Sequence, residues 1–462
     1  MKKVLFLAYY YPPIGGAGVQ RIAKFIKYLP HYGYVPIIVA RTAKVGESTA
    51  KDFSLLTDIR SATTYRVELT KREECLRQFC LNKFIRRVPK IPFKWWIAAA
   101  KRVCQEVVQV EKPDVICITV PPYSGVAAAV TVAKKHNIPW VLDMRDPWAI
   151  DPLSFYSTWF HYRLELAAMK RACQQSSAVI MNTPRALATL KDSFPELSAG
   201  KLFCITNGWD RDDFGSNTIS ATRKSFSKPI TIAHTGAFLT LPAIKMDPTS
   251  RKVLGIRGNR LLETFKYSLG KSHVLARSPY YMFKALRLLL DAGKISETDI
   301  HLVFIGELTQ EDKNLATMFD LENIVEFKGY VSHHQSIRFL SSADVVFLAV
   351  HKPLNGQPPL TIPGKTYEYM AIGKPILSLV PRGDVHDFVR QSGLGFICDP
   401  TDVNQIAQTL LDLLHKHLSP AGLNVKVDEE FIQQFERSTL TKKLAEVFNF
   451  AISRHCSRYS EV

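Results

Sequence analysis

The sequence predicts an α/β protein built from two doubly wound, Rossmann-like domains with parallel sheets. Compact apolar runs alternate with segments of helical periodicity, first within residues 4–205 and again from residue 230 onward. Such alternation is typical of a parallel sheet covered by helices on both faces. The chain of 462 residues is also too long for a single hydrophobic core, which indicates more than one domain.

The domain boundaries are predicted from turn signals and from changes in periodicity. We place the first domain at 1–208 and the second at 209–440, because the first alternating series ends at an Asn-Gly turn. Residues 240–276 are polar, basic and poor in periodicity, so we expect an insertion or mobile loop there. The segment 441–462 is expected to be a helix that packs back on the first domain.

The most informative stretch lies between two apolar runs, Val345–Val350 and Ile376–Val380, which we interpret as buried strands. A proline suited to a first helical position and a Gly-Lys-Pro stop signal predict a short helix over 364–372. This helix would begin at the carboxyl edge of a parallel sheet. Ligands collect at that edge, and the unpaired N–H groups of a helix start attract anions.

Two charged side chains share one face of this predicted helix. Lys365 adds a positive charge at the helix start, and Glu368 could accept two hydroxyl hydrogen bonds from a sugar. A phosphate near Lys365 and a ribose near Glu368 would together describe a nucleotide. The alternative is that Glu368 only complements the helix dipole and Lys365 is solvated.

A second glycine-rich helix start follows the apolar run Val4–Ala8. Gly15 and Gly16 would let the backbone approach a phosphate or a sugar closely. A dinucleotide fingerprint would need a third glycine near Arg21 and an acid after the next strand, and both are absent, so a nicotinamide site is disfavoured. The alternative is a turn that simply needs small residues.

A polar run follows the predicted strand 140–142. Its charged residues are Asp143, Arg145 and Asp146. Two carboxylates and a guanidinium at the carboxyl edge of a sheet predict a catalytic cluster. The alternative is an internally satisfied Arg–Asp pair that braces a loop.

The net charge of +18, from 60 Lys+Arg and 42 Asp+Glu, favours an anionic partner: nucleic acid, an acidic membrane or a phosphate-bearing substrate. The segment 71–96 is basic, contains interleaved aromatic residues and ends in Trp95 and Trp96. It would suit an anionic membrane surface with its rings at the interface, or a solvated helix face beside two buried tryptophans. No second stretch repeats it as a single-strand groove would, so we expect no nucleic-acid partner.

The sequence also carries expectations about compartment and metals. The first apolar run is too short for a secretory signal, and no uninterrupted apolar stretch approaches the ~20 residues that span a bilayer. We therefore expect a cytoplasmic protein, at most peripheral on the inner face of the membrane. The eight cysteines include no Cys-x-x-Cys pair, and the diacid at Asp210 and Asp212 is better interpreted as part of a linker, so we expect no metal.

The order and spacing of several short motifs together resemble a known family. These are Tyr11-Pro12-Pro13 with Gly15-Gly16, Pro121-Pro122-Tyr123-Ser124, Asp143 to Trp148, Asn207-Gly208-Trp209-Asp210, Thr235-Gly236, Gly306-Glu307, Gly329-Tyr330, and Gly364-Lys365 through Pro375. With them the chain resembles glycosyltransferases of the GT-B fold, in particular the large retaining, family 4-like group that makes bacterial polysaccharides and glycolipids.

The resemblance implies a donor site in the second domain and an acceptor site in the first. Glu368 resembles the glutamate that holds the ribose of the nucleotide sugar, Gly364 and Lys365 lie near the donor, and Arg277 resembles the cation that steadies the diphosphate. The implied donor site extends to Gly236 and Glu307 in the second domain and to the loop of Gly15 and Gly16 in the first. No cofactor is implied beyond the nucleotide sugar, which is a substrate.

Two positions depart from the family pattern. Leu360 replaces a glutamate eight positions before Glu368, and a Thr-Val-Pro-Pro run at 119–122 replaces a histidine, whose place Asp143, Arg145 or Asp146 would take. The implied function is transfer of a sugar, with retention, to a lipid-linked or polysaccharide acceptor in cell-envelope or exopolysaccharide synthesis. The alternatives are a nucleotide-sugar epimerase on the same fold and a non-catalytic subunit.

Overall fold

The computed structural model describes residues 1–42, 52–60, 62–81, 93–217, 229–256, 267–419, 422–423 and 425–460. The chain divides into two compact units. Unit 1 comprises Met1–Asn207, Phe265–Leu269 and Arg437–Val462, and unit 2 comprises Gly208–Thr264 and Gly270–Glu436. The chain therefore first enters unit 2 at Gly208 and finally leaves it after Glu436, with a return to unit 1 at Phe265–Leu269. The sequence placed the two boundaries at 208/209 and 440/441.

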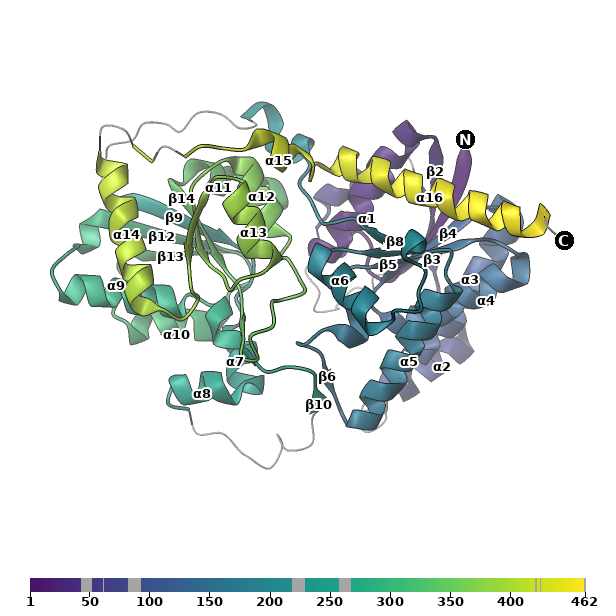
Figure 1. Ribbon diagram of the computed structural model, residues 1–462, viewed down its shortest axis with the longest axis horizontal. Helices are drawn as coiled ribbons and strands as arrows, with labels where there is room; N and C mark the ends of the chain where they lie inside the picture. The colour runs from purple at the N-terminus through teal and green to yellow at the C-terminus, as the bar shows by residue number, and fades with distance from the viewer. Residues whose placement is uncertain are drawn as a thin grey trace. The chain divides into compact units, whose positions relative to one another are not determined.

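Within the described residues, unit 1 holds a seven-stranded parallel sheet in the order β3-β2-β1-β4-β5-β7-β8 (Figure 1). The strands are β1 Lys2–Ala8, β2 Tyr34–Arg41, β3 Thr63–Val67, β4 Val115–Val120, β5 Trp140–Met144, β7 Ala178–Met181 and β8 Leu202–Cys204. The helices are α1 Ala17–Tyr28, α2 Lys71–Leu81, α3 Lys94–Glu111, α4 Val126–His136, α5 Trp159–Gln175, α6 Pro184–Ser193 and α16 Arg437–Ser460. The order of connection reverses between β1 and β4, which makes this pair the switch point of the sheet.

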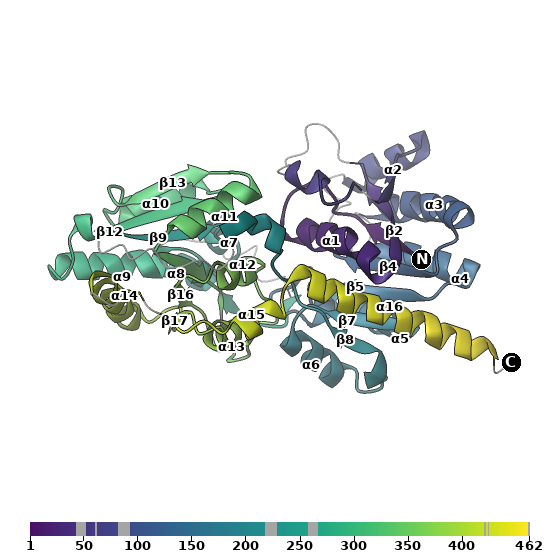
Figure 2. The ribbon, with the colours of Figure 1, turned by 90° about the horizontal axis from the view of Figure 1, so that it is seen from above.

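Side chains alternate between the two faces of this sheet, as the period of two along a strand requires. Val4 and Phe6 of β1 enter the core that includes residues of α1 and α16. Leu5 and Leu7 are equally buried and point to the opposite face, where α3 lies against β1 and β2. Figure 2 shows α16, in yellow, running beside α1. A short ribbon, β6 Phe155–Tyr156 paired with β10 Tyr267–Ser268, completes unit 1.

Unit 2 holds a six-stranded parallel sheet among its described residues, in the order β13-β12-β9-β14-β16-β17. The strands are β9 Ile230–Thr235, β12 Ile300–Ile305, β13 Val325–Gly329, β14 Val345–Ala349, β16 Ile376–Leu379 and β17 Gly395–Cys398, with a ribbon of β11 Ser272–His273 and β15 Lys352–Pro353. The helices are α7 Thr240–Met246, α8 Pro248–Val253, α9 Tyr280–Asp291, α10 Gln310–Met318, α11 His333–Ser342, α12 Lys365–Ile372, α13 Asp384–Gln391, α14 Val403–Leu418 and α15 Glu429–Gln433. The switch point lies between β9 and β14, and the predicted pair of doubly wound parallel sheets is confirmed.

The segment 240–276 is more regular than the sequence predicted. It begins with α7 and α8, and Asp247 caps α8 by accepting a hydrogen bond from Thr249 N at 2.9 Å. The second carboxylate oxygen of Asp247 accepts a hydrogen bond from Val274 N at 2.9 Å, so α8 is tied to the chain that precedes α9. The intervening residues 257–266 lie outside the described residues.

The basic and aromatic segment 71–96 also differs from its membrane interpretation. Trp95 and Trp96 begin α3 and are 5% and 1% exposed, with their rings 6.3 and 5.1 Å from the ring of Tyr9. Placing these two rings at a membrane interface was therefore wrong, because unit 1 buries them in its own core. The stretch 82–92 of this segment lies outside the described residues. No described helix combines the length and the apolar composition that a membrane crossing requires.

The packing of α16 generates a stability prediction. The ring of Phe448 is fully buried, 6.0 Å from the ring of Phe6 and 5.4 Å from that of Tyr34. The substitution Phe448→Ala would leave a cavity and should lower the free energy of unfolding by about 3–5 kcal/mol in a denaturant titration. Lys442→Ala, at an exposed position of the same helix, should change it by less than about 0.5 kcal/mol. Equal effects of the two substitutions would contradict the packing of α16 on this sheet.

Candidate functional site

Four basic side chains gather at the switch point of unit 2. His234 lies near the end of β9, His351 follows β14, Lys365 is the first residue of α12, and Arg277 precedes α9. Lys365 Nζ lies 3.0 Å from His234 Nε2, and burial, with a smaller effect of the Arg277 charge, lowers the pKa of His234, His351 and Lys365. The edge where the sequence predicted an anion site is therefore lined with side chains that repel one another when charged.

The hydrogen bonds of His234 fix its tautomer. Its Nδ1 lies 2.8 Å from the carbonyl oxygen of Phe347, which can only accept, so Nδ1 carries the proton. Nε2 is then an acceptor, and the Lys365 ammonium donates to it. Burial, followed by the charges of Lys365 and Arg277, holds the pKa of His234 well below its usual value. His234 is thus a neutral ring that positions Lys365.

The remaining basic groups lack a compensating anion. Burial and the Arg277 charge lower the pKa of Lys365 to about 7, against a weaker opposite effect of Glu368. The same two causes lower the pKa of His351 to about 3, and burial lowers the pKa of Arg277. His351 Nδ1 is buried without a hydrogen-bond partner among the described residues. The described residues place no carboxylate in ion-pair contact with Lys365 or Arg277, so the site favours an anionic ligand.

Glycines let the backbone pack tightly around these groups. Gly236 has φ of 87°, a backbone conformation that favours glycine, and a Cβ there would lie 3.1 Å from Lys365 Nζ. A Cβ on Gly306 would lie 2.9 Å from the Cα of Gly236, and Gly236 N donates to Ile305 O at 2.7 Å. Gly364 precedes α12 and offers no side chain to cap its first N–H groups. A phosphate could therefore approach the start of α12 closely.

Glu368 is held by a residue that sequence reasoning missed. Its Oε1 lies 2.9 Å from His333 Nε2, and His333 Nδ1 lies 3.7 Å from an oxygen of Asp213. His333 begins α11, and the sequence shows only an adjacent His-His pair without the spacing of metal ligands. No sequence signal connects it to Glu368, which follows 35 residues later. The structure thus brings Lys365, Glu368 and His333 to one edge, whereas Glu307 is exposed beside Gly306.

Asp143 in unit 1 belongs to a buried ion pair rather than to an open cluster. Arg21 Nη2 lies 2.8 Å from Asp143 Oδ1, and the two side chains are 1% and 4% exposed. Arg21 also donates to Ile205 O at 2.9 Å and to Thr206 O at 2.7 Å. This geometry favours the alternative of an internal Arg–Asp pair, although the partner is Arg21 and not Arg145.

Arg145 and Asp146 lie at the carboxyl edge of the same sheet. Arg145 donates to Pro121 O at 2.8 Å. Its guanidinium packs against Gly18, where a Cβ would lie only 1.6 Å from Arg145 Nη1, so this position must be glycine for Arg145 to lie there. Burial lowers the pKa of Arg145 and raises that of Asp146, while the Arg145 charge partly counters the latter shift. These two residues therefore remain the candidates for chemistry in unit 1.

The predicted loop glycines and linker acids have local roles. Gly15 and Gly16 lie between β1 and α1, and Gly16 has φ of 110°, a conformation that favours glycine. Asp210 accepts a hydrogen bond from Asp212 N at 3.2 Å and so closes a turn at the start of unit 2. In the described part of the chain, no three His, Cys, Asp or Glu side chains are arranged as metal ligands.

Solved structures define the class of fold. Anabaena HepE in complex with UDP and glucose matches with a TM-score of 0.60 and 14% identity, over 97% of this chain and 100% of that chain. Sucrose-phosphate synthase from Thermosynechococcus elongatus gives 0.60 and 14%, over 97% and 98%. The lipopolysaccharide outer core galactosyltransferase WaaB gives 0.56 and 12%, over 100% of both chains. The two Rossmann-like units are those of the GT-B fold.

Sequence comparisons then give the family. A model of the glycosyl transferase 4-like domain matches residues 58–208, and one of glycosyl transferases group 1 matches residues 276–432. The chain belongs to the GT-B glycosyltransferases of this 4-like, group 1 family. The putative colanic acid biosynthesis glycosyltransferase WcaL of Salmonella typhimurium is 25% identical over 142 residues, which are 30% of this chain and 34% of that protein.

The buried pair of Arg21 and Asp143 can be tested against a catalytic role. Asp143→Asn would leave the guanidinium buried without its counter-charge, and the free energy of unfolding should fall by about 3–5 kcal/mol in a denaturant titration. Asp291→Asn, which breaks an exposed pair with Arg287 at 2.6 Å, should cost only about 0.3–0.5 kcal/mol. If Asp143→Asn is as stable as the wild type but inactive, Asp143 has a catalytic role and the structural interpretation is wrong.

The lowered pKa of Lys365 predicts proton uptake when an anion binds. A bound phosphate favours the ammonium form, so a group with a pKa of about 7 must gain a proton in alkaline solution. Calorimetry of nucleoside diphosphate binding at about pH 8, in buffers of different ionisation enthalpy, should detect this uptake. Lys365→Arg keeps a permanent charge and should bind without it. The same uptake in both proteins would assign the proton to another group.

Proposed function

We propose that this protein transfers a sugar from a nucleoside diphosphate sugar to a saccharide-bearing acceptor in cell-envelope or extracellular polysaccharide synthesis. The observation that carries the proposal is the group of Lys365, Arg277, His234 and His351 at the switch point of unit 2. A diphosphate would supply the negative charge that these buried side chains lack. That HepE is described with UDP and glucose, and WcaL with colanic acid synthesis, supports this class of donor and product.

The proposed chemistry follows from where charge develops. Breaking the bond between the sugar and the diphosphate leaves additional negative charge on the departing phosphate oxygen. Lys365, Arg277 and the N–H groups at the start of α12 would stabilise that charge, because they are fixed in place before the reaction. Burial strengthens the effect, since the surrounding dielectric is low. We expect Glu368, oriented by His333, to accept hydrogen bonds from the ribose hydroxyls.

The acceptor side of the proposal belongs to unit 1. Arg145 and Asp146 lie at the carboxyl edge of its sheet, where parallel sheets bind ligands. We propose that they face the acceptor hydroxyl, that transfer retains the configuration at the sugar carbon, and that the acceptor is lipid-linked. The family supports retention, and the exposed apolar surface of unit 1 supports the lipid.

Product analysis separates transfer from the other activities that this fold carries. Methanocaldococcus jannaschii UDP-GlcNAc 2-epimerase has the same fold, with a TM-score of 0.53 and 11% identity. A glycosyltransferase consumes the donor only when an acceptor is present and releases the nucleoside diphosphate. Isomerised donor without an acceptor would favour an epimerase, and donor binding without turnover would favour a non-catalytic subunit.

The donor site has a direct binding test. Calorimetry with UDP, GDP and ADP, alone and as sugar conjugates, should find selective binding that Glu368→Ala weakens by about 1.5–3 kcal/mol, or about 10–150-fold in Kd. Glu326→Ala removes a carboxylate of the same unit that pairs with Lys328 and His301, and it should bind like the wild type. Unchanged binding in Glu368→Ala, or no binding by the wild type, would refute the donor site.

A further inference from the structure

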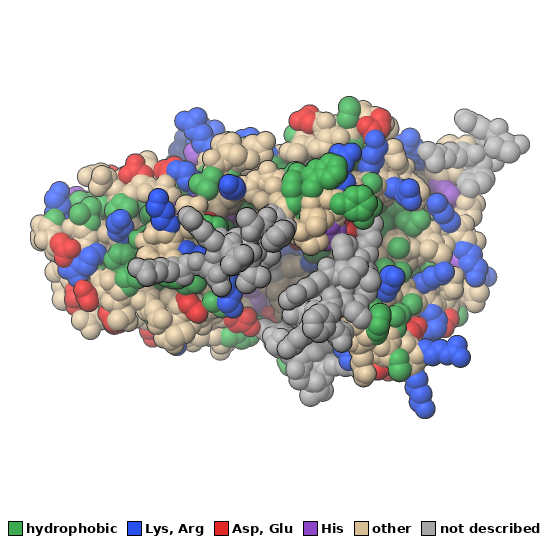
Figure 3. All heavy atoms as spheres, turned by 90° about the horizontal axis from the view of Figure 1, so that it is seen from below, with side chains coloured by type: hydrophobic (Ala, Val, Ile, Leu, Met, Phe, Trp, Pro, Cys, Tyr) green, Lys and Arg blue, Asp and Glu red, His purple; other side chains and the backbone are tan. Residues whose placement is uncertain are grey.

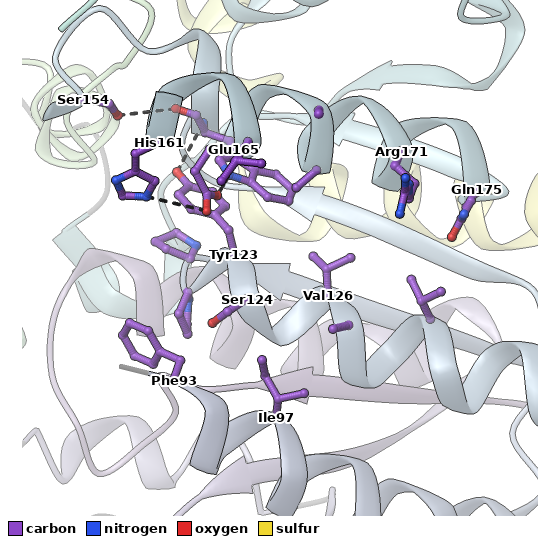
Figure 4. A pocket seen from close by; sticks show the side chains of 18 of the residues that line it. Phe93, Ile97, Tyr123, Ser124, Val126, Ser154, His161, Glu165, Arg171 and Gln175 are labelled. Atoms are coloured by element: carbon purple, nitrogen blue, oxygen red, sulfur yellow. Dashed lines mark hydrogen bonds and ion pairs between the residues drawn. The ribbon is translucent and has the colours of Figure 1, made fainter. Parts of the chain in front are cut away.

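A groove lies between α4 and α5 in unit 1. Its volume is about 920 Å³, and Figure 4 shows side chains of both helices along its length. The lining residues of α5 include His161, Glu165, Arg171 and Gln175, which recur at helical spacing and so share one face. The span from His161 to Gln175 corresponds to about 20 Å of helix. The groove is therefore long enough for an extended chain and is built entirely from unit 1.

The walls of this groove are mainly apolar. Ala127, Val130 and Ala168 are small side chains that keep it open along its length. Glu165 accepts a hydrogen bond from Trp148 Nε1 at 2.9 Å and lies 3.9 Å from His161 Nε2, so its charge is already engaged. Polar side chains such as Thr131 and Gln175 also line the groove, but its surface is mainly apolar and so suits a hydrocarbon better than a sugar. The composition of the groove favours a hydrocarbon.

One mouth of the groove carries three exposed aromatic side chains and a leucine, which together we call the aromatic rim: Phe155, Trp159, Phe160 and Leu164, which are 46%, 57%, 66% and 39% exposed. Phe155 and Leu164 also line the groove, so the rim and the groove are continuous. Large apolar side chains that are exposed together mark an interaction surface. Figure 3 shows hydrophobic side chains among lysine and arginine side chains on the lower side of the molecule, where α5 lies in Figure 1.

The charge of the two helices identifies the kind of surface. α4 ends in Lys134, Lys135 and His136 and contains no acid, and α5 carries Arg163, Lys170 and Arg171 against the single acid Glu165. The guanidinium of Arg163 lies 5.6 Å from the centre of the Trp159 ring. Exposed aromatic rings beside basic side chains suit an anionic bilayer, with rings at the interface and cations at the head groups.

We propose that the α4–α5 groove holds a hydrocarbon chain of a membrane lipid while the aromatic rim contacts an anionic bilayer. The groove begins beside Tyr123 and Trp148, which follow the carboxyl ends of β4 and β5. A lipid in the groove would present its head group at the edge of unit 1 that carries Arg145. The role of that lipid as the acceptor rests on the proposed function, whereas the binding of the lipid does not.

Trp159 provides a native reporter for this surface. The chain has six tryptophans, all within the described residues, and the other five are at most 5% exposed. Vesicles of phosphatidylglycerol mixed with phosphatidylcholine should co-sediment the protein, and lipids brominated in their acyl chains should quench its emission. Trp159→Phe should still bind but lose the quenching. Sedimentation with phosphatidylcholine alone should be weaker, because the basic side chains then lack anionic head groups.

Two variants with substitutions at exposed positions test whether the rim, and not exposed apolar surface elsewhere, binds the vesicles. The double variant Trp159→Ser with Phe160→Ser should weaken partitioning to anionic vesicles by about tenfold or more, because it removes the interfacial rings. Phe79→Ser is the matched control: Phe79 is 57% exposed on α2, outside the rim, in the segment for which the sequence left a membrane surface and a solvated helix face open. Equal losses in the two proteins would overturn the assignment to the rim.

The groove itself is tested by filling it. Ala127→Phe adds a ring at an exposed position of α4 that lines the groove. A phosphatidylglycerol with a photoreactive acyl chain should label peptides of α4 and α5 in the wild type, and this labelling should fall in Ala127→Phe while vesicle binding persists. Unchanged labelling would overturn the groove as the chain site. A protein that binds nucleotide but not vesicles would overturn this inference alone, and one that binds vesicles but not nucleotide would overturn the proposed function alone.

Discussion

The site depends on a cluster of basic groups at the switch point of unit 2, for which the described residues supply no ion-paired acid. Charges buried near one another raise the free energy of the folded state unless they lose protons or gain a counter-ion. Here His234 and His351 respond by staying neutral, and Lys365 has a pKa of about 7. Gly236 and Gly306 then let the backbone pack closely beside the lysine. The site is therefore arranged for a ligand that brings negative charge.

Unit 1 has the same fold, but it neutralises its buried cation Arg21 with groups of its own. Arg21 is matched by Asp143 and by two carbonyl oxygens, so its charge is satisfied without a ligand. What unit 1 leaves unsatisfied is apolar surface, in the groove between α4 and α5 and in the exposed rings beside it. The two units thus differ in what they lack, which is why we propose an anionic donor for unit 2 and an apolar partner for unit 1.

The sequence predicted the helices and strands, which depend on residues that are close together along the chain. The helix expected over 364–372 is α12, Lys365–Ile372, and the flanking apolar runs are β14 and β16, because periodicity and turn residues act locally. The sequence could not predict that Asp143 pairs with Arg21, because 122 residues separate them. For the same reason it could not predict the contact of His333 with Glu368, which lies 35 residues away. Polar residues near the ends of buried strands, such as His234, were visible in the sequence and were not recognised as part of the site.

The environment of Lys365 also changes what its amine can do chemically. An ordinary lysine is almost fully protonated at neutral pH and therefore a poor nucleophile, whereas an amine with a pKa of about 7 is unprotonated in about half of the molecules. Its neighbours attract anions, so an anionic aldehyde would meet both a complementary field and a free lone pair there. The position of Lys365, beside His234 and the charge of Arg277, therefore favours formation of an imine with loss of water.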